Sequence, residues 1–166
     1  MVAWMRQEAG RWRAVDALLN APGAQPVLPG PALTECIVVA RRAGNTSSPE
    51  QIATTLSAMG VTVEPPRDVD MLRAAGLLED SWAHPGRHPA SSVTLSFGDA
   101  LILAVVERLG VKVLTADRYW VQVAAEGVTS AVEVETSVLL RVIISKNYPI
   151  VQRRHGLLNS VLNGQI

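Results

Sequence analysis

The spacing of apolar and polar residues along the chain predicts α-helices that alternate with short β-strands. Apolar positions at helical spacing, with serine, proline or glycine at the boundaries, favour helices at residues 2–19, 31–42, 49–59, 68–82, 97–109 and 118–125. Apolar or β-branched runs favour strands at 26–29, 61–63, 111–115 and 131–134. The prolines and glycine of 84–92 indicate a loop.

Strands that alternate with helices favour a layered α/β fold, because parallel strands are joined by right-handed helical crossovers. In such sheets the working crevice lies at the carboxyl ends of the strands. Asp117 follows the predicted strand 111–115, and Asp99 at the start of the preceding helix can reach the same edge. With Glu35 they form a set of acids whose hard oxygen ligands suit Mg²⁺ or Mn²⁺.

Each of these acids also has a purely structural interpretation. Ser96 and Asp99 have the spacing of a capping box, in which the acid accepts a hydrogen bond from a backbone N–H. Asp117 directly precedes a predicted helix and can cap it. Glu35 lies in the first turns of a helix, where acids complement the dipole. Ser48 and Gln51 form a second capping box. Periodicity alone therefore does not establish an enzyme.

Composition narrows the function classes. The 166 residues carry no net charge, which excludes a broad basic surface that holds nucleic acid by charge alone. Cys36 is the single cysteine, so an internal disulfide framework and a cysteine-rich zinc module are excluded. There is no P-loop, nucleophile elbow or dinucleotide fingerprint. Without a signal peptide or a membrane-spanning run, a cytoplasmic protein is expected.

Two stretches, 94–104 and 109–118, resemble the C-terminal half of a PIN domain, in particular that of the VapC toxins of bacterial toxin–antitoxin pairs. In that family one Asp opens a helix and a second follows a strand that ends in Leu-Thr. The segment 31–35 is similar to the family's segment with an early helical Glu. The resemblance implies a three-layer, Rossmann-like parallel sheet flanked by helices.

The same resemblance implies a function. Glu35, Asp99 and Asp117 would be the catalytic and metal-binding acids, with Thr115 as a supporting hydroxyl. The activity would be that of an endoribonuclease that depends on Mg²⁺ or Mn²⁺. RNA would be the substrate, a cognate antitoxin would hold the enzyme in check, and the protein would be a homodimer.

The chain departs from the family pattern at its start. PIN domains open with a short central strand that ends in an Asp, and residues 2–5 resemble the apolar run that follows it, so that strand is expected to be absent. Asp16 is not a replacement, because too few residues separate it from Glu35 for a strand and the full first helix. We therefore expect this chain to bind Mn²⁺ poorly and to cleave RNA weakly or not at all, and an added upstream strand with its Asp to restore activity.

The predicted organisation is a PIN-like domain at 1–135 and an atypical extension at 136–166. Within the extension, the β-branched run 137–144 is an edge strand or a tail, or it pairs with the sheet edge left by the absent strand. Two rival functions stay open. One is a PIN-fold module that binds an antitoxin or RNA without cleavage, and the other is an unrelated α/β protein whose acids are only helix caps.

Overall fold

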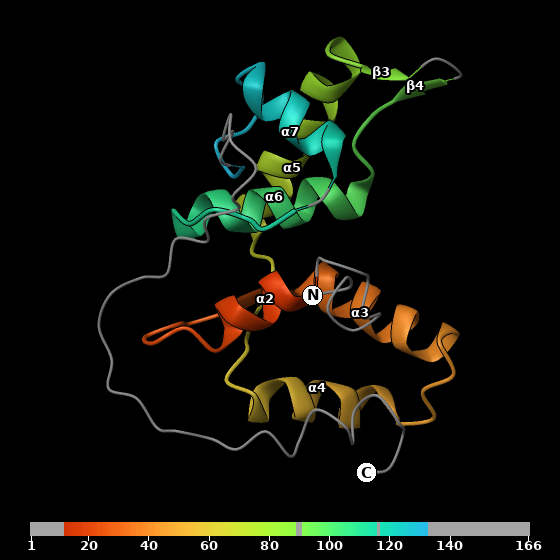
Figure 1. Ribbon diagram of the computed structural model, residues 1–166. Coiled ribbons are helices and arrows are strands. Elements are labelled where there is room, and N and C mark those ends of the chain that lie inside the picture. The colour runs from red at the N-terminus through yellow and green to blue at the C-terminus, as the bar shows by residue number, and fades with distance from the viewer. Residues whose placement is uncertain (1–11, 89–90, 116, 133–166) are drawn as a thin grey trace. The chain divides into compact units, whose positions relative to one another are not determined.

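The structure, a computed structural model, describes residues 12–88, 91–115 and 117–132 (Figure 1). The chain divides into two compact units. Among the described residues, the first unit comprises residues 12–64 and the second comprises those from 65 to 132. Within the described ranges, none of the helices has the length and apolar character needed to cross a membrane.

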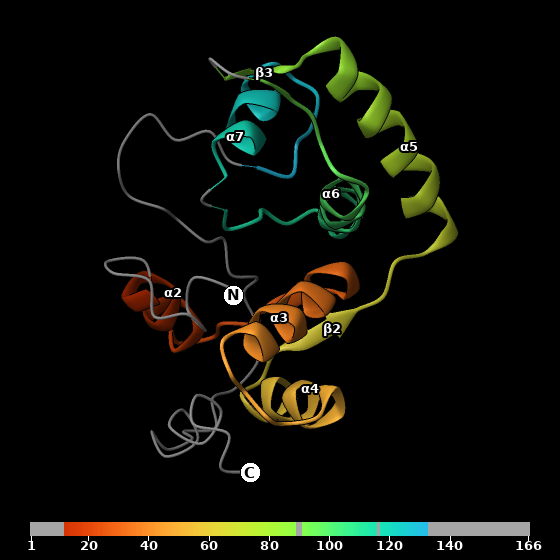
Figure 2. The same cartoon turned by 90° about the vertical axis from the view of Figure 1, so that its right-hand side faces the viewer.

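The first unit combines helices with a small parallel sheet. Its elements are α2 (Trp12–Leu19), β1 (Val27–Pro29), α3 (Gly30–Arg42), α4 (Pro49–Ala58) and β2 (Thr62–Glu64). Strands β1 and β2 pair in parallel, with Val27 opposite Thr62 and Leu28 opposite Val63. Both α3 and α4 contact β2, as Figure 2 shows. The predicted parallel α/β arrangement is therefore confirmed.

Buried aliphatic side chains hold this first unit together. The side chains of its core are Leu28, Cys36, Ala40, Ile52, Leu56 and Val61. Burial of one large aliphatic side chain contributes about 1.5–3 kcal/mol. The capping box of α4 is confirmed, because the Ser48 N–H donates to Gln51 Oε1 (2.7 Å) and the Gln51 N–H donates to Ser48 Oγ (3.3 Å). Local sequence and core packing thus agree at this helix.

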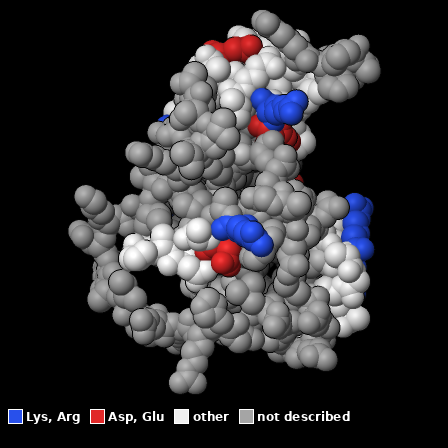
Figure 3. Space-filling view, in the orientation of Figure 1, with Lys and Arg blue, Asp and Glu red and all other residues white. Residues whose placement is uncertain are grey.

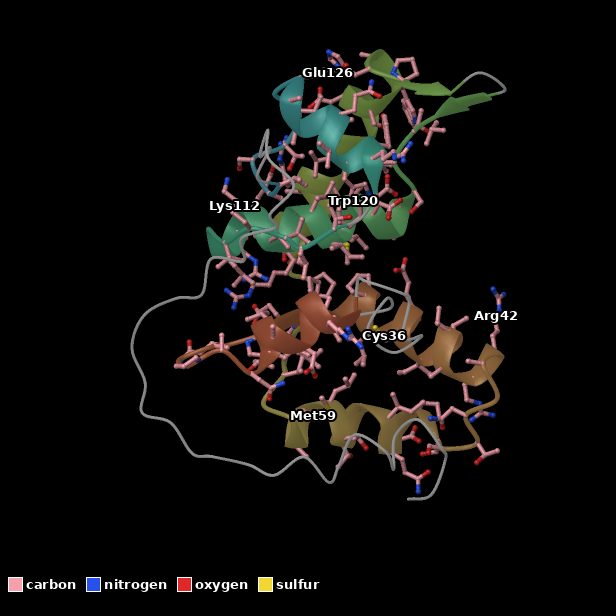
Figure 4. All side chains as sticks on the ribbon, viewed as in Figure 1. Cys36, Arg42, Met59, Lys112, Trp120 and Glu126 are labelled. Carbon is pink, nitrogen blue, oxygen red and sulfur yellow. The ribbon has the colours of Figure 1, made fainter. Side chains whose placement is uncertain are left out.

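The second unit is built around one buried helix. Its elements are α5 (Asp68–Ala83), β3 (Gly86–His88), β4 (Ser91–Val93), α6 (Phe97–Leu109) and α7 (Arg118–Ala125). Every residue of α6 from Ala100 to Val106 is buried. Figure 2 looks along α6 and shows α5 on one side of it and α7 on the other. The α7 side chain Trp120, labelled in Figure 4, is buried.

The loop prediction for residues 84–92 is wrong. Strands β3 and β4 form an antiparallel pair there, with Gly86 opposite Val93. A tertiary contact accompanies this pairing, because Gly86 lies against the ring of Tyr119. A Cβ at Gly86 would come within 2.9 Å of Tyr119 Cδ2 and 3.0 Å of Val93 Cβ. The small size of glycine, read from the sequence as a turn signal, here allows close packing.

The predicted strand 111–115 is reduced to one bridge. Val113 pairs in parallel with Val132, and the Val113 N–H donates to the Ala131 carbonyl (2.8 Å). The Lys112 ammonium, labelled in Figure 4, donates to the Ser130 carbonyl (2.6 Å). The parallel direction agrees with the prediction, but regular pairing does not extend along 111–115. The end of the predicted strand 131–134 and the run 137–144 lie outside the described residues.

Candidate functional site

Asp99 is fixed at the start of α6 by its own helix cap. Its Oδ2 accepts hydrogen bonds from the Ser96 hydroxyl (2.7 Å) and the Ser96 N–H (3.1 Å). In return, the Asp99 N–H donates to Ser96 Oγ (3.1 Å). The capping box predicted from the sequence is therefore confirmed. These contacts use one carboxylate oxygen, and Oδ1 accepts no hydrogen bond from any residue that the structure describes.

Asp117 is the N-cap residue of α7, one position before the helix, whereas Asp99 lies in the first turn of α6. The Tyr119 N–H donates to Asp117 Oδ1 (2.7 Å), so the predicted N-cap is confirmed. The Asp117 N–H donates to the Thr115 hydroxyl oxygen (3.0 Å), which fixes the turn into the helix. The Asp117 side chain is exposed, and within the described ranges its Oδ2 accepts no hydrogen bond. Thr115 thus supports the backbone of Asp117.

The two acids therefore use their carboxylate oxygens in the same way. Among the described residues, one oxygen of each accepts the hydrogen bonds of a helix cap, and the other accepts none and can bind a ligand. A carboxylate oxygen is a hard donor, which suits Mg²⁺ or Mn²⁺ better than soft metals. The donor chemistry of Asp99 and Asp117 thus fits a divalent ion. A cap does not exclude this second role, since a carboxylate offers several acceptor positions.

A buried serine connects the two helix starts. Ser81, near the end of α5, accepts a hydrogen bond from the Leu95 N–H at its Oγ (3.3 Å). Its backbone carbonyl accepts one from the Tyr119 hydroxyl (3.1 Å). Leu95 precedes α6 and Tyr119 lies in the first turn of α7. The structure therefore ties the starts that carry Asp99 and Asp117 to the same end of α5.

No sequence signal pointed to Ser81 or Tyr119. Their hydrogen bond joins residues far apart along the chain, and neither belongs to a motif. A buried serine near the end of a helix is visible only after the helices have been packed. These two residues are the part of the candidate site that sequence reasoning missed.

Glu35, the third predicted acid, belongs to the first unit, whereas Asp99 and Asp117 belong to the second. Its side chain projects from α3 and is exposed. The neighbouring Cys36 is buried, and burial raises the pKa of its thiol to about 11 (Figure 4). Cys36 is therefore a protonated core side chain, as expected for a cysteine buried among apolar groups. Among the described residues, no three His, Cys, Asp or Glu side chains form a group that could hold a metal ion.

Other acids of the second unit have a structural role. Asp70 is 1% exposed and accepts hydrogen bonds from Arg108 Nε at both carboxylate oxygens (2.8 and 3.0 Å). The Arg67 N–H donates to Asp70 Oδ2 (2.7 Å). Burial disfavours the charged form, but these hydrogen bonds outweigh it and lower the pKa of Asp70. The carboxylate of Asp70 is thus committed to joining α5 and α6.

Glu107 is a second acid whose carboxylate has a structural role. Arg73 Nε donates to its Oε2 (2.6 Å), and the Thr129 hydroxyl (2.5 Å) and the Ser130 N–H (3.0 Å) donate to its Oε1. Burial opposes ionisation, yet these hydrogen bonds lower the pKa of Glu107. On the face shown in Figure 3, basic and acidic side chains lie close together.

Comparison with known proteins identifies the family. Residues 1–126 match the PIN domain, and this range includes Glu35, Asp99 and Asp117. Comparisons with curated proteins and with solved structures gave no match. The matched range covers most of the 166 residues, and the α/β arrangement with its small parallel sheet agrees with it. The chain therefore belongs to the PIN domain family.

Proposed function

We propose that this protein is an endoribonuclease that depends on Mg²⁺ or Mn²⁺. PIN domains are generally nucleases that act on nucleic acids, and they generally use divalent metal ions. RNA as the substrate is inferred from the stretches 94–104 and 109–118, which resemble the VapC toxins. On the same ground, the proposed partners are a cognate antitoxin and a second copy of the chain.

The placement of Asp99 and Asp117 is the observation that carries this proposal. They lie at two helix starts that are tied to the same end of α5 through Ser81. Each keeps one oxygen outside its cap, and among the described residues neither has an arginine partner like that of Asp70. These features are expected of acids that hold a cation together.

In this proposal Asp99 and Asp117 bind the divalent ion, and Glu35 is a further ligand or the base that orients the attacking water. Ser96 and Thr115 keep the two aspartates in place through the contacts described above. A divalent ion bound there supplies positive charge that favours attack by water and departure of the leaving oxygen. Hydrolysis of the phosphodiester leaves a 3′-hydroxyl and a 5′-phosphate, by analogy with the family.

Removal of one charge at the site tests the proposal, both in the unaltered chain and in the chain with the added upstream strand and its Asp, which we expect to be the more active of the two. Asp99→Asn and Asp117→Asn keep an oxygen that can cap the helix but lose the anionic ligand. We expect each to lower Mn²⁺-dependent cleavage of single-stranded RNA by at least about 100-fold, because loss of a ligand costs no less than loss of its supporting contacts. Binding of Mn²⁺ to the purified chain, followed by electron paramagnetic resonance, should weaken in parallel.

The matched control is Glu126→Gln, which removes an acid at the opposite end of α7 from Asp117. It should leave both readouts unchanged. Cleavage by Asp99→Asn at the rate of the unaltered protein would contradict the proposal. Binding of RNA or antitoxin with no metal-dependent cleavage by the unaltered protein would instead support the rival, a PIN-fold binding module.

A further inference from the structure

Ser81 is fully buried, at 0% exposure, and its hydroxyl and carbonyl make hydrogen bonds to several segments of the second unit. Its hydroxyl donates to the Leu78 carbonyl (2.8 Å) within α5 and accepts from the Leu95 N–H (3.3 Å) before α6. Its carbonyl accepts from the Tyr119 hydroxyl (3.1 Å) on α7. One residue thus contacts three helical segments of the second unit.

Tyr119 completes this arrangement and is itself held from two sides. Its hydroxyl is shared between the Ser81 carbonyl and the His84 carbonyl (3.0 Å). Its ring lies against Gly86, where no Cβ could fit without displacing it. Burial raises the pKa of Tyr119, so the hydroxyl stays protonated and remains a donor at neutral pH. The Tyr119 side chain is therefore fixed by the contact of its ring with Gly86 and by the hydrogen bonds of its hydroxyl.

These contacts lie next to the two acids along the chain. Leu95 directly precedes Ser96, whose hydroxyl binds the Asp99 carboxylate. The Tyr119 N–H itself binds the Asp117 carboxylate. A shift of either helix start relative to α5 would therefore move one acid relative to the other. Metal ligands tolerate displacements of only about 0.5 Å before binding weakens.

We propose that Ser81 and Tyr119 form a clamp that holds the starts of α6 and α7 in one register and so sets the separation of Asp99 and Asp117 needed for a divalent ion. The metal-binding part rests on the proposed function. Ser81 and Tyr119 are positioning residues in this scheme, because they act through the two aspartates. They contact neither the ion nor the substrate.

Hydrogen exchange tests the clamp without any activity assay. Tyr119→Phe keeps the ring on Gly86 and removes only the hydroxyl. We expect roughly two- to tenfold faster exchange of the Asp99 and Leu95 amides, on segments outside α7, as loss of one net hydrogen bond implies. Ser81→Ala should accelerate the Leu95 amide and the Tyr119 amide. Unchanged exchange at Asp99 and Leu95 in Tyr119→Phe would overturn the clamp.

The control is Thr129→Val, which removes a hydrogen bond to Glu107 at the other end of α6. It should accelerate exchange of the Ser130 amide, whose acceptor is also Glu107, and leave Asp99 and Leu95 unchanged. If Thr129→Val accelerates Asp99 as strongly as Tyr119→Phe does, the coupling is a general loosening of the unit. That result would also overturn the clamp.

Metal titration tests the consequence for the site. We expect Tyr119→Phe and Ser81→Ala each to raise the Mn²⁺ concentration for half-maximal binding by about tenfold, with the double variant at least as impaired. The KM for RNA at saturating Mn²⁺ should change less than the Mn²⁺ midpoint. Thr129→Val should leave the midpoint unchanged.

The outcomes separate the clamp from the proposed function. Coupled exchange with an unchanged Mn²⁺ midpoint would make the clamp a folding device and overturn its role in metal binding. If neither the unaltered protein nor the chain with the added upstream strand and its Asp binds Mn²⁺ or cleaves RNA, the proposed function fails. In that case, the exchange data still decide whether Ser81 and Tyr119 couple the two helix starts.

Discussion

The two ends of α6 use acidic residues in opposite ways. At its end, Glu107 receives hydrogen bonds from Arg73, Thr129 and Ser130. At its start, Asp99 receives hydrogen bonds, among the described residues, only from Ser96, through one oxygen. The first carboxylate is neutralised and joins α6 to two other segments, whereas the second is oriented and has one oxygen outside its cap. The number and kind of partners thus distinguish an acid that holds the fold from one that can serve a site.

The largest expected effect comes from the ion pair beside Glu107. Arg108→Ala leaves the buried Asp70 carboxylate without its charged partner and should lower the free energy of unfolding by about 3–5 kcal/mol. Urea denaturation followed by circular dichroism measures this change. Arg42→Ala, at an exposed position in the last turn of α3, serves as the control and should stay within about 0.5 kcal/mol. A loss below about 1 kcal/mol for Arg108→Ala would show that the pair adds little to stability.

Acid titration sharpens the same comparison. The folded-state pKa values of Asp70 and Glu107 are lowered from ordinary values of 3.8 and 4.5, so below these values the unfolded chain binds more protons than the folded protein. Their contribution to stability is therefore complete above about pH 5 and is lost as the pH falls through the lower folded-state pKa values.

Denaturation of the unaltered protein and of a Glu107→Gln variant between pH 2 and about 7 measures this dependence. The variant should show a shallower loss of stability below about pH 4.5, because one of the two linked carboxylates is gone. Identical pH profiles would indicate that Glu107 contributes no proton-linked stability.

The smallest expected effect on stability is at Asp99. Asp99→Asn should change the free energy of unfolding by less than about 1 kcal/mol, because the amide oxygen can accept both hydrogen bonds from Ser96. Asp70→Asn, which removes the charge from a buried pair, should cost clearly more in the same thermal denaturation assay. Equal losses for the two variants would remove the distinction between the structural and the available acids.

Local chemistry made part of this structure predictable. The boxes Ser48–Gln51 and Ser96–Asp99 and the cap at Asp117 depend on residues within one turn, so sequence spacing was sufficient. The boundaries of the α6 and α7 helices follow from the same local signals. The caps confirm the structural role of Asp99 and Asp117. The metal-binding role of these two acids and of Glu35 stays a prediction.

Contacts between distant segments were not predictable in the same way. The prolines and glycine of residues 84–92 predicted a loop, whereas the structure has the hairpin β3–β4. The packing of Gly86 against Tyr119, a residue from another helix, has no signal in the sequence. The Asp70–Arg108 pair and the Ser81–Tyr119 hydrogen bond likewise join residues with no common motif. Charge, size and polarity at one position do not reveal a partner that only the packing of α5, α6 and α7 supplies.

The bridge between Val113 and Val132 closes the segment that carries α7 into a loop whose two ends lie together. Its two ends are fixed side by side, so the polypeptide leaves and re-enters the fold at one place. Lengthening such an excursion costs little closure entropy, about 0.6 kcal/mol for each doubling. Residues 125–127 are exposed, so an insertion there can present a new binding surface while Asp117, and the contacts of Thr129 and Ser130 with Glu107, stay in place.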